Sequence, residues 1–135
     1  MLSISHINGV RVMEMDLVVT RNLQLFIRMA ELPCTHIAAR MQWQIGAQLV
    51  FLEWRNARLL LTCGIQQRHY HHDDLLLLQQ CWQLERFNGV PQRIYLLKLG
   101  MMVSCSPPAL SGAEFWFQLY QQQRALLRRL PGECR

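Results

Sequence analysis

The stretch MQWQIGAQLVFLEWRNARLLLTCGI, residues 41–65, contains three strand-like segments separated by two short turns. In the first segment Met41, Trp43 and Ile45 alternate with glutamines, which is the pattern of a half-buried strand. Only Gly46-Ala47 and Asn56-Ala57 are available for the turns, so neighbouring strands must run antiparallel. The stretch therefore predicts a meander whose strands are residues 41–45, 50–54 and 59–65.

Before the meander, residues 16–32 show the period of an amphipathic helix, with apolar residues at i, i+3, i+4 and i+7. Asp16 is the expected N-cap residue, and Pro33 is expected to end the helix. Residues 1–12 show no period, and we expect an N-terminal extension there that is disordered. Translation from Met13 or Met15 remains an alternative, and residues 13–135 are predicted to form a single domain.

After the meander, a polar loop (residues 66–72) precedes a second helix that Asp73 and Asp74 open. Its apolar content is expected to run through Trp82 to Leu84, and residues 88–91 close it. A hairpin follows around Gly100, and Pro107-Pro108 terminates it. The two strands of this hairpin are predicted at residues 94–99 and 101–105.

The last predicted helix covers residues 111–130, and Gln123 interrupts its apolar stripe. Ser111 and Glu114 have the spacing of a capping box, and Pro131-Gly132 stops the helix. The whole chain thus reads α-β-β-β-α-β-β-α with antiparallel strands, which is an α+β fold.

The chain has 135 residues, of which 51% are hydrophobic and 17% charged, so a single folded domain is expected. A domain of this size has a limited interior, and we expect part of the apolar surface to face a partner protein. The net charge is +5, but the basic residues are scattered. The tightest cluster, Arg124, Arg128 and Arg129, has no nucleic-acid recognition signature beside it, so no nucleic-acid partner is predicted.

No apolar run approaches the ~18 residues of a membrane span, and no secretory signal is visible. Five cysteines lie far apart without a C-x-x-C pair, which favours reduced thiols in the cytoplasm, with Cys134 the most exposed. Catalytic patterns are missing, and the pair Cys34 and His36 need not face one another. We therefore predict no enzyme, no cofactor and no native metal.

The segment His69–Asp74 is histidine-rich and leaves three interpretations open. Adventitious metal binding is plausible because imidazoles and carboxylates are metal ligands. A pH sensor is a second interpretation, since histidines titrate between about pH 5 and 8. A solvated loop is the third, and it needs no special chemistry.

Phe115, Trp116 and Phe117 are consecutive in the last helix, where successive side chains diverge by about 100°. At least one of these rings is therefore expected at the surface, where an aromatic side chain favours contact with a partner. The partner-binding candidates are Phe115, Trp116, Phe117, Tyr120, Trp54, Arg124 and Arg128.

Three strings resemble the SsaM/CesL family of type III secretion chaperones. They lie at residues 15–27, at Gly89–Leu97 and, most specifically, at Met102–Pro108, which reads MVSCSPP and precedes a helix as in that family. The resemblance runs from Met15 to Leu130. It implies the type III secretion chaperone-like fold.

The resemblance also implies a bacterial cytoplasmic protein that regulates secretion by steric contacts and has no catalytic residues. Its implied partners are the gatekeeper (SsaL/SepL type), a SpiC-type small protein and the export apparatus at the inner membrane. Such complexes hold back effectors while translocators are exported. The alternative is a homodimeric class I chaperone that wraps a secreted effector. This chain departs from acidic relatives in its basic charge, and an acidic patch on the gatekeeper would complement it.

Overall fold

The computed structural model describes residues 16–34, 36–66 and 70–131. The predicted extension, residues 1–12, lies outside them. The element order confirms the predicted α-β-β-β-α-β-β-α and adds a short 3₁₀ helix, η2, after the second α-helix. The helices are α1 (Leu17–Met29), α2 (His72–Cys81), η2 (Leu84–Phe87) and α3 (Ala113–Leu127), and the strands are β1 (Arg40–Ile45), β2 (Gln48–Arg55), β3 (Arg58–Gln66), β4 (Arg93–Leu97) and β5 (Gly100–Cys105).

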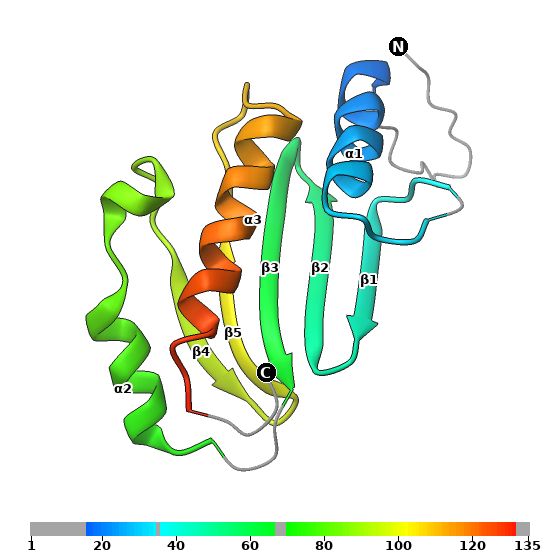
Figure 1. Cartoon of the computed structure of the whole chain (residues 1–135). Helices are drawn as coiled ribbons and strands as arrows, with labels where there is room; N and C mark the ends of the chain where they lie inside the picture. Colours follow the sequence, from blue (N-terminus) through cyan, green and yellow to red (C-terminus); the bar gives the residue numbers. More distant parts are fainter. Residues whose placement is uncertain (1–15, 35, 67–69, 132–135) are drawn as a thin grey trace.

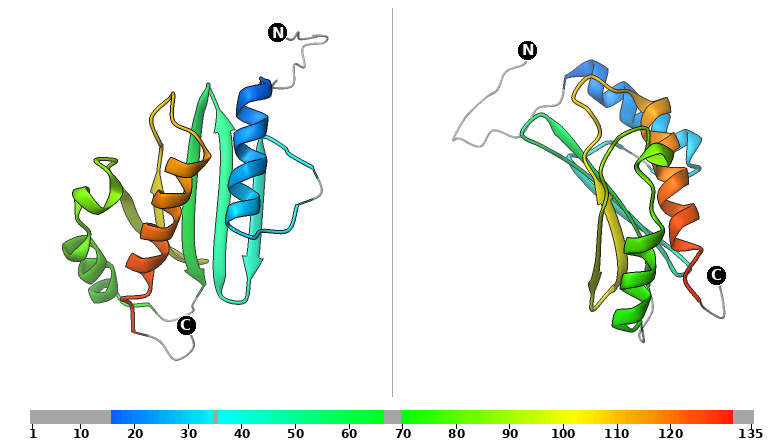
Figure 2. Two further views of the ribbon diagram at one scale, coloured as in Figure 1. Left: turned by 45° about the horizontal axis from the view of Figure 1, so that its top comes forward. Right: turned by 90° about the vertical axis from the view of Figure 1, so that its left-hand side faces the viewer.

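The five strands form one antiparallel sheet in the order β1-β2-β3-β5-β4. Helices α1 and α3 pack side by side on one face, and α2 lies along β4 (Figures 1 and 2). The edge view of Figure 2 shows the helical layer on that face, and no described helix covers the opposite face. None of the helices in the described ranges is long and apolar enough to cross a membrane.

The core lies between this helical layer and the central strands. Leu61 and Cys63 of β3 and Val103 of β5 are fully buried beneath α3. The predicted turns are confirmed: Gly46, Asn56 and Ala57 have positive φ angles of 61°, 55° and 60°. The meander places Val50, Leu52, Leu61 and Cys63 on the helical face, while Leu49, Phe51 and Leu60 lie on the opposite face of the sheet.

Helix α1 begins as predicted and ends earlier. The Asp16 carboxylate accepts a hydrogen bond from the Val19 amide at 2.9 Å. The helix stops at Met29 because Glu31 adopts a left-handed conformation with φ 57°. The Leu32 amide then bonds back to the Ile27 carbonyl at 3.0 Å, which satisfies an otherwise free helix carbonyl. Pro33 follows this end instead of causing it.

The predicted capping box of α3 is wrong. The Ser111 hydroxyl donates to the Pro108 carbonyl at 2.6 Å and accepts from the Trp116 indole at 2.9 Å, so it does not cap the helix. The side chain of Asn22 on α1 takes that role, because its oxygen accepts from the Ala113 amide at 3.0 Å. The middle of α1 is thereby joined to the start of α3 through two residues 91 apart in sequence.

Helix α2 is shorter than predicted. It ends at Cys81, and Trp82 leaves the helix in an extended conformation. The Trp82 ring then packs edge-on against Phe87 of η2, with ring centroids 6.2 Å apart. At the start of the helix, the Asp74 carboxylate accepts from the His71 amide at 2.9 Å, which fits the predicted capping role of the aspartate pair.

The cysteines differ in accessibility, and this predicts their reactivity. Burial raises the pKa of the Cys63 thiol well above its ordinary value and that of Cys105 to about 11. Because the thiolate is the reactive form, neither should react with Ellman's reagent at pH 8 until the protein unfolds. In a Cys134→Ser variant, exposed Cys34 should react first and half-buried Cys81 more slowly. Rapid reaction of all four thiols in the native state would contradict this core.

Candidate partner-binding surface

Two of the predicted contact residues lie in the core. Trp116 is 3% exposed and Tyr120 is 2% exposed, so neither side chain is available to a partner in this structure. Tyr120 packs edge-on against Phe26 at 5.4 Å between ring centroids, which joins α3 to α1. The choice of these two as surface residues is therefore corrected, because the apolar stripe of α3 faces the sheet through them.

The other three aromatic candidates are half-buried. Phe115 and Phe117 flank Trp116 on α3, and Trp54 lies on β2, on the helical face of the sheet. Phe117 packs beside Tyr120, with ring centroids 5.9 Å apart. Phe115 and Phe117 are therefore the partly exposed rings of the three consecutive aromatic residues, and they lie on either side of the buried Trp116. Part of each ring still packs against the core.

Arg124 and Arg128 lie beside a cavity of about 220 Å³, which we call the Arg124 cavity. The Arg124 guanidinium lies 5.3 Å from the centre of the Tyr120 ring, a cation–π contact. Burial raises the pKa of the Tyr120 hydroxyl, which accepts a hydrogen bond from the Gln48 amide at 3.1 Å. The cavity is lined by Ile45, Ala47, Gln48, Cys63, Gly64, Ile65, Arg124, Leu127 and Arg128.

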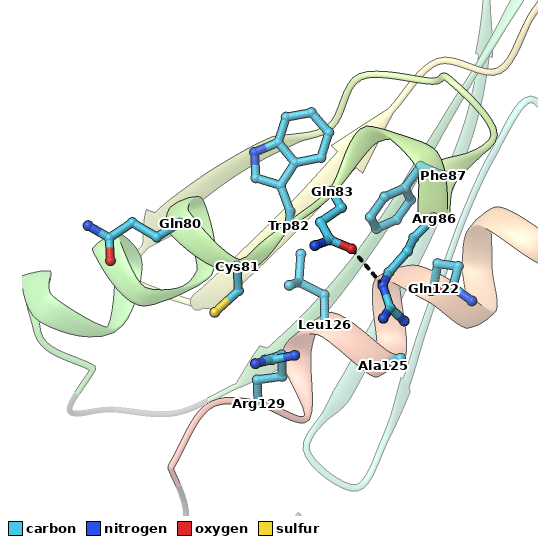
Figure 3. A pocket seen from close by; sticks show the side chains of 10 residues that line it. All are labelled: Gln80, Cys81, Trp82, Gln83, Arg86, Phe87, Gln122, Ala125, Leu126 and Arg129. Atoms are coloured by element: carbon cyan, nitrogen blue, oxygen red, sulfur yellow. Dashed lines mark hydrogen bonds between the residues drawn. The ribbon is translucent and has the colours of Figure 1, made fainter.

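A second cavity, of about 280 Å³, lies on the opposite side of α3, where η2 and the end of α2 meet it; we call it the Trp82 cavity (Figure 3). Arg86 enters from η2 and Arg129 from the turn after α3, and both are exposed. The Arg86 guanidinium donates to the Gln83 side chain at 3.0 Å. The lining residues are Gln80, Cys81, Trp82, Gln83, Arg86, Phe87, Gln122, Ala125, Leu126 and Arg129.

The arginines on this side of the molecule take part in no ion pair among the described residues. Within the described ranges both ion pairs involve Glu53, which contacts Arg40 at 3.9 Å and Arg55 at 2.7 Å. Arg86 and the arginines at the end of α3 take part in neither. The sequence showed the arginine cluster at residues 124–129. Arg86 comes close to this cluster because η2 packs against α3, and the apolar pattern of the sequence did not predict η2.

Two of the three strings that carry the family resemblance, residues 89–97 and 102–108, meet in the sheet, and the third overlaps α1. Ser104 of β5 pairs with Arg93 of β4, and its hydroxyl hydrogen-bonds the Thr62 hydroxyl at 2.7 Å and the Tyr95 hydroxyl at 2.6 Å. One residue beyond β5, the Ser106 hydroxyl donates to the Leu59 carbonyl at 2.9 Å. These hydrogen bonds connect β3, β4 and β5, so residues of these strings stabilise this end of the sheet.

The histidine-rich segment is only partly within the described residues. His71 and His72 are exposed at the start of α2, whereas His69 lies outside the described ranges. No group of three or more histidine, cysteine or acidic residues that could hold a metal ion occurs in the part of the chain that the structure describes. A pH-sensing role for this segment stays a prediction.

Comparison with known proteins identifies relatives over nearly the whole chain. The SsaM family model matches residues 16–130. The secretion system apparatus protein SsaM of Salmonella typhimurium is 37% identical over 123 residues, which cover 90% of this chain and 98% of that protein. A chain of the ExoT–SpcS complex from Pseudomonas aeruginosa superposes with a TM-score of 0.57 and 12% identity, covering 87% of this chain and all of that one. The predicted type III secretion chaperone-like fold is thereby confirmed.

Proposed function

This chain belongs to the SsaM family, and from that premise we propose that it is a type III secretion chaperone and regulator that binds the gatekeeper protein (SsaL/SepL type). In this proposal a SpiC-type small protein joins the complex, which holds back effectors until translocators have been exported. The protein acts in the bacterial cytoplasm and is recruited to the export apparatus at the inner membrane. The observation that carries the proposal is the match over residues 16–130.

The surface supports a role in binding proteins. Half-buried Phe115 and Phe117 combine with the arginines at the end of α3 (residues 124, 128 and 129) to offer apolar contact area beside positive charge. Aromatic residues and arginine contribute most to protein–protein affinity. The relatives found belong to a secretion apparatus and not to an enzyme class, which agrees with a function exerted by contact alone.

Co-expression with the gatekeeper tests this proposal. We expect the two proteins to co-elute on size-exclusion chromatography at physiological salt, and addition of the SpiC-type protein to shift the complex to a larger size. In cells, deletion of the gene encoding this chain should release effectors before translocators are complete. Separate elution of purified chain and gatekeeper, together with an unchanged order of secretion, would exclude the proposal.

A homodimeric effector chaperone is the second candidate, and one observation favours it. Helix α2 exposes Leu76 and Leu77 at 41% and 37%, and Leu84 follows at 44%. Exposed leucines close in sequence suit an interface between two copies of the chain. The mass of the isolated protein separates the candidates: a stable dimer that forms no gatekeeper complex would favour the effector chaperone.

A further inference from the structure

The Trp82 cavity combines apolar lining residues with two cationic side chains. Trp82, Phe87 and Leu126 of α3 line it, and the Trp82 and Phe87 rings pack edge-on. The guanidinium groups of Arg86 and Arg129 come from different elements and lie beside the same opening (Figure 3). Such a site can accept an apolar side chain and, next to it, an anionic group.

The charged residues that line this cavity favour an anionic ligand. Of the described residues that line it, two are arginines and none is acidic. Neither arginine is in either ion pair of the described chain, both of which involve Glu53. The Nε of Arg86 donates a hydrogen bond to Gln83, which orients the guanidinium group. Its two terminal nitrogens can still donate to a ligand. The side-chain amides of Gln80, Gln83 and Gln122 add neutral hydrogen-bonding groups.

We propose that the Trp82 cavity is the docking site for an acidic segment of the partner protein, in which an apolar side chain enters the cavity and neighbouring carboxylates bind Arg86 and Arg129. This inference rests on the proposed function, since it names the chemistry by which the gatekeeper would be recognised. The charge complementarity favours an acidic peptide over a second copy of this chain, whose own surface carries the same net positive charge of +5.

Affinity measurements on the gatekeeper complex test the inference. Arg86→Gln and Arg129→Gln should each weaken binding about tenfold, because each removes a charge-assisted contact. Arg21→Gln is the matched control: it removes the same charge from an exposed position on α1, at the other end of the helical layer (Figure 1). Its affinity should stay within about twofold of wild type, since a distant exposed charge contributes little.

A second pair of variants probes the cavity without removing an arginine. Ala125 is exposed at the rim, and Ala125→Glu places a negative charge where the acidic segment would lie. Gln121→Glu adds the same charge to an exposed position of α3 that does not line the cavity. We expect binding to fall about tenfold in the first variant and to change little in the second. Raising the salt from about 0.1 M to about 0.5 M should weaken wild type more than an Arg86→Gln/Arg129→Gln double variant.

The outcomes separate this inference from the proposed function. A gatekeeper complex that forms with unchanged affinity and salt dependence in all cavity variants overturns the docking site and leaves the function standing. Absence of any complex with wild type overturns both. Tight binding of wild type to a mixed-sequence DNA duplex, lost in the double variant, would instead identify a nucleic-acid site. Circular dichroism of each variant confirms that the fold is intact.

Discussion

Gly100→Ala should destabilise the protein by about 3 kcal/mol or more, because the backbone at this position has no room for a Cβ atom. Gly100 begins β5 with φ 156°, and a Cβ there would lie 2.1 Å from the Ile65 carbonyl oxygen and 2.9 Å from the Gln66 Cα. Both neighbours are backbone atoms of β3, so relief requires the β3–β5 pairing to open at this end.

Gly46→Ala provides the matched control. Gly46 also has a positive φ, 61°, but a Cβ there would meet no atom within 4 Å. Its cost should be limited to the left-handed backbone, about 1 kcal/mol. Urea unfolding followed by tryptophan fluorescence measures both variants against wild type. Equal losses in the two variants would show that conformation, and not the close approach of β3, makes Gly100 necessary.

The meander and the hairpin could be predicted from the sequence because their information is local, whereas the pairing of β5 with β3, which joins them into one sheet, was not predicted. Three strand-like segments within residues 41–65 and the two tight turns between them specify neighbouring antiparallel strands without reference to the rest of the chain. The same holds for the Asp16 cap, which acts on an amide three residues away. Each of these features depends on residues that lie close together in sequence.

The errors at the start of α3 and at the candidate surface occurred where distant residues determine the outcome. Asn22 caps α3 from 91 residues away, so the local serine signal at Ser111 was misleading. The Trp82 cavity needs Arg86 and Arg129, which only the packing of η2 on α3 brings to one opening. Among the partner candidates, the burial of Trp116 depends on how α3 is rotated against the sheet. A helical period predicts that a helix has an apolar face, but it does not predict which residues at the border of that face are buried.

Gln123 is the residue whose role changes most between sequence and structure. As a polar residue it interrupts the apolar stripe, yet its side chain is fully buried. Its amide nitrogen donates to the Gln92 side-chain oxygen at 2.9 Å and to the Leu61 carbonyl at 3.3 Å. The amide nitrogen thus joins α3 to β3 and to the segment before β4, and these partners offset part of the cost of its burial. The amide oxygen is buried without a hydrogen-bond partner among the described residues.

Gln123→Glu should therefore lower the free energy of unfolding at pH 7 by about 3–5 kcal/mol, since it buries a charge among hydrogen-bond acceptors. The introduced carboxyl has almost the same shape, so packing is preserved and the electrostatic cost is isolated. Burial and the facing oxygens raise its pKa in the folded state above the ~4.3 of an unfolded chain. A group with a raised folded pKa contributes stability below its unfolded pKa and loses it as the pH rises.

The defect of this variant should consequently be smallest near pH 4 and should grow toward neutral pH, at up to about 1.4 kcal/mol per pH unit. Gln121→Glu makes the same chemical change at an exposed position of the same helix and should track wild type within about 0.5 kcal/mol. Urea titrations of the two variants and wild type from pH 4 to pH 8 measure the difference at each pH. A deficit that does not depend on pH would mean that lost hydrogen bonds, and not a buried charge, dominate, and the role assigned to the Gln123 amide would have to be revised.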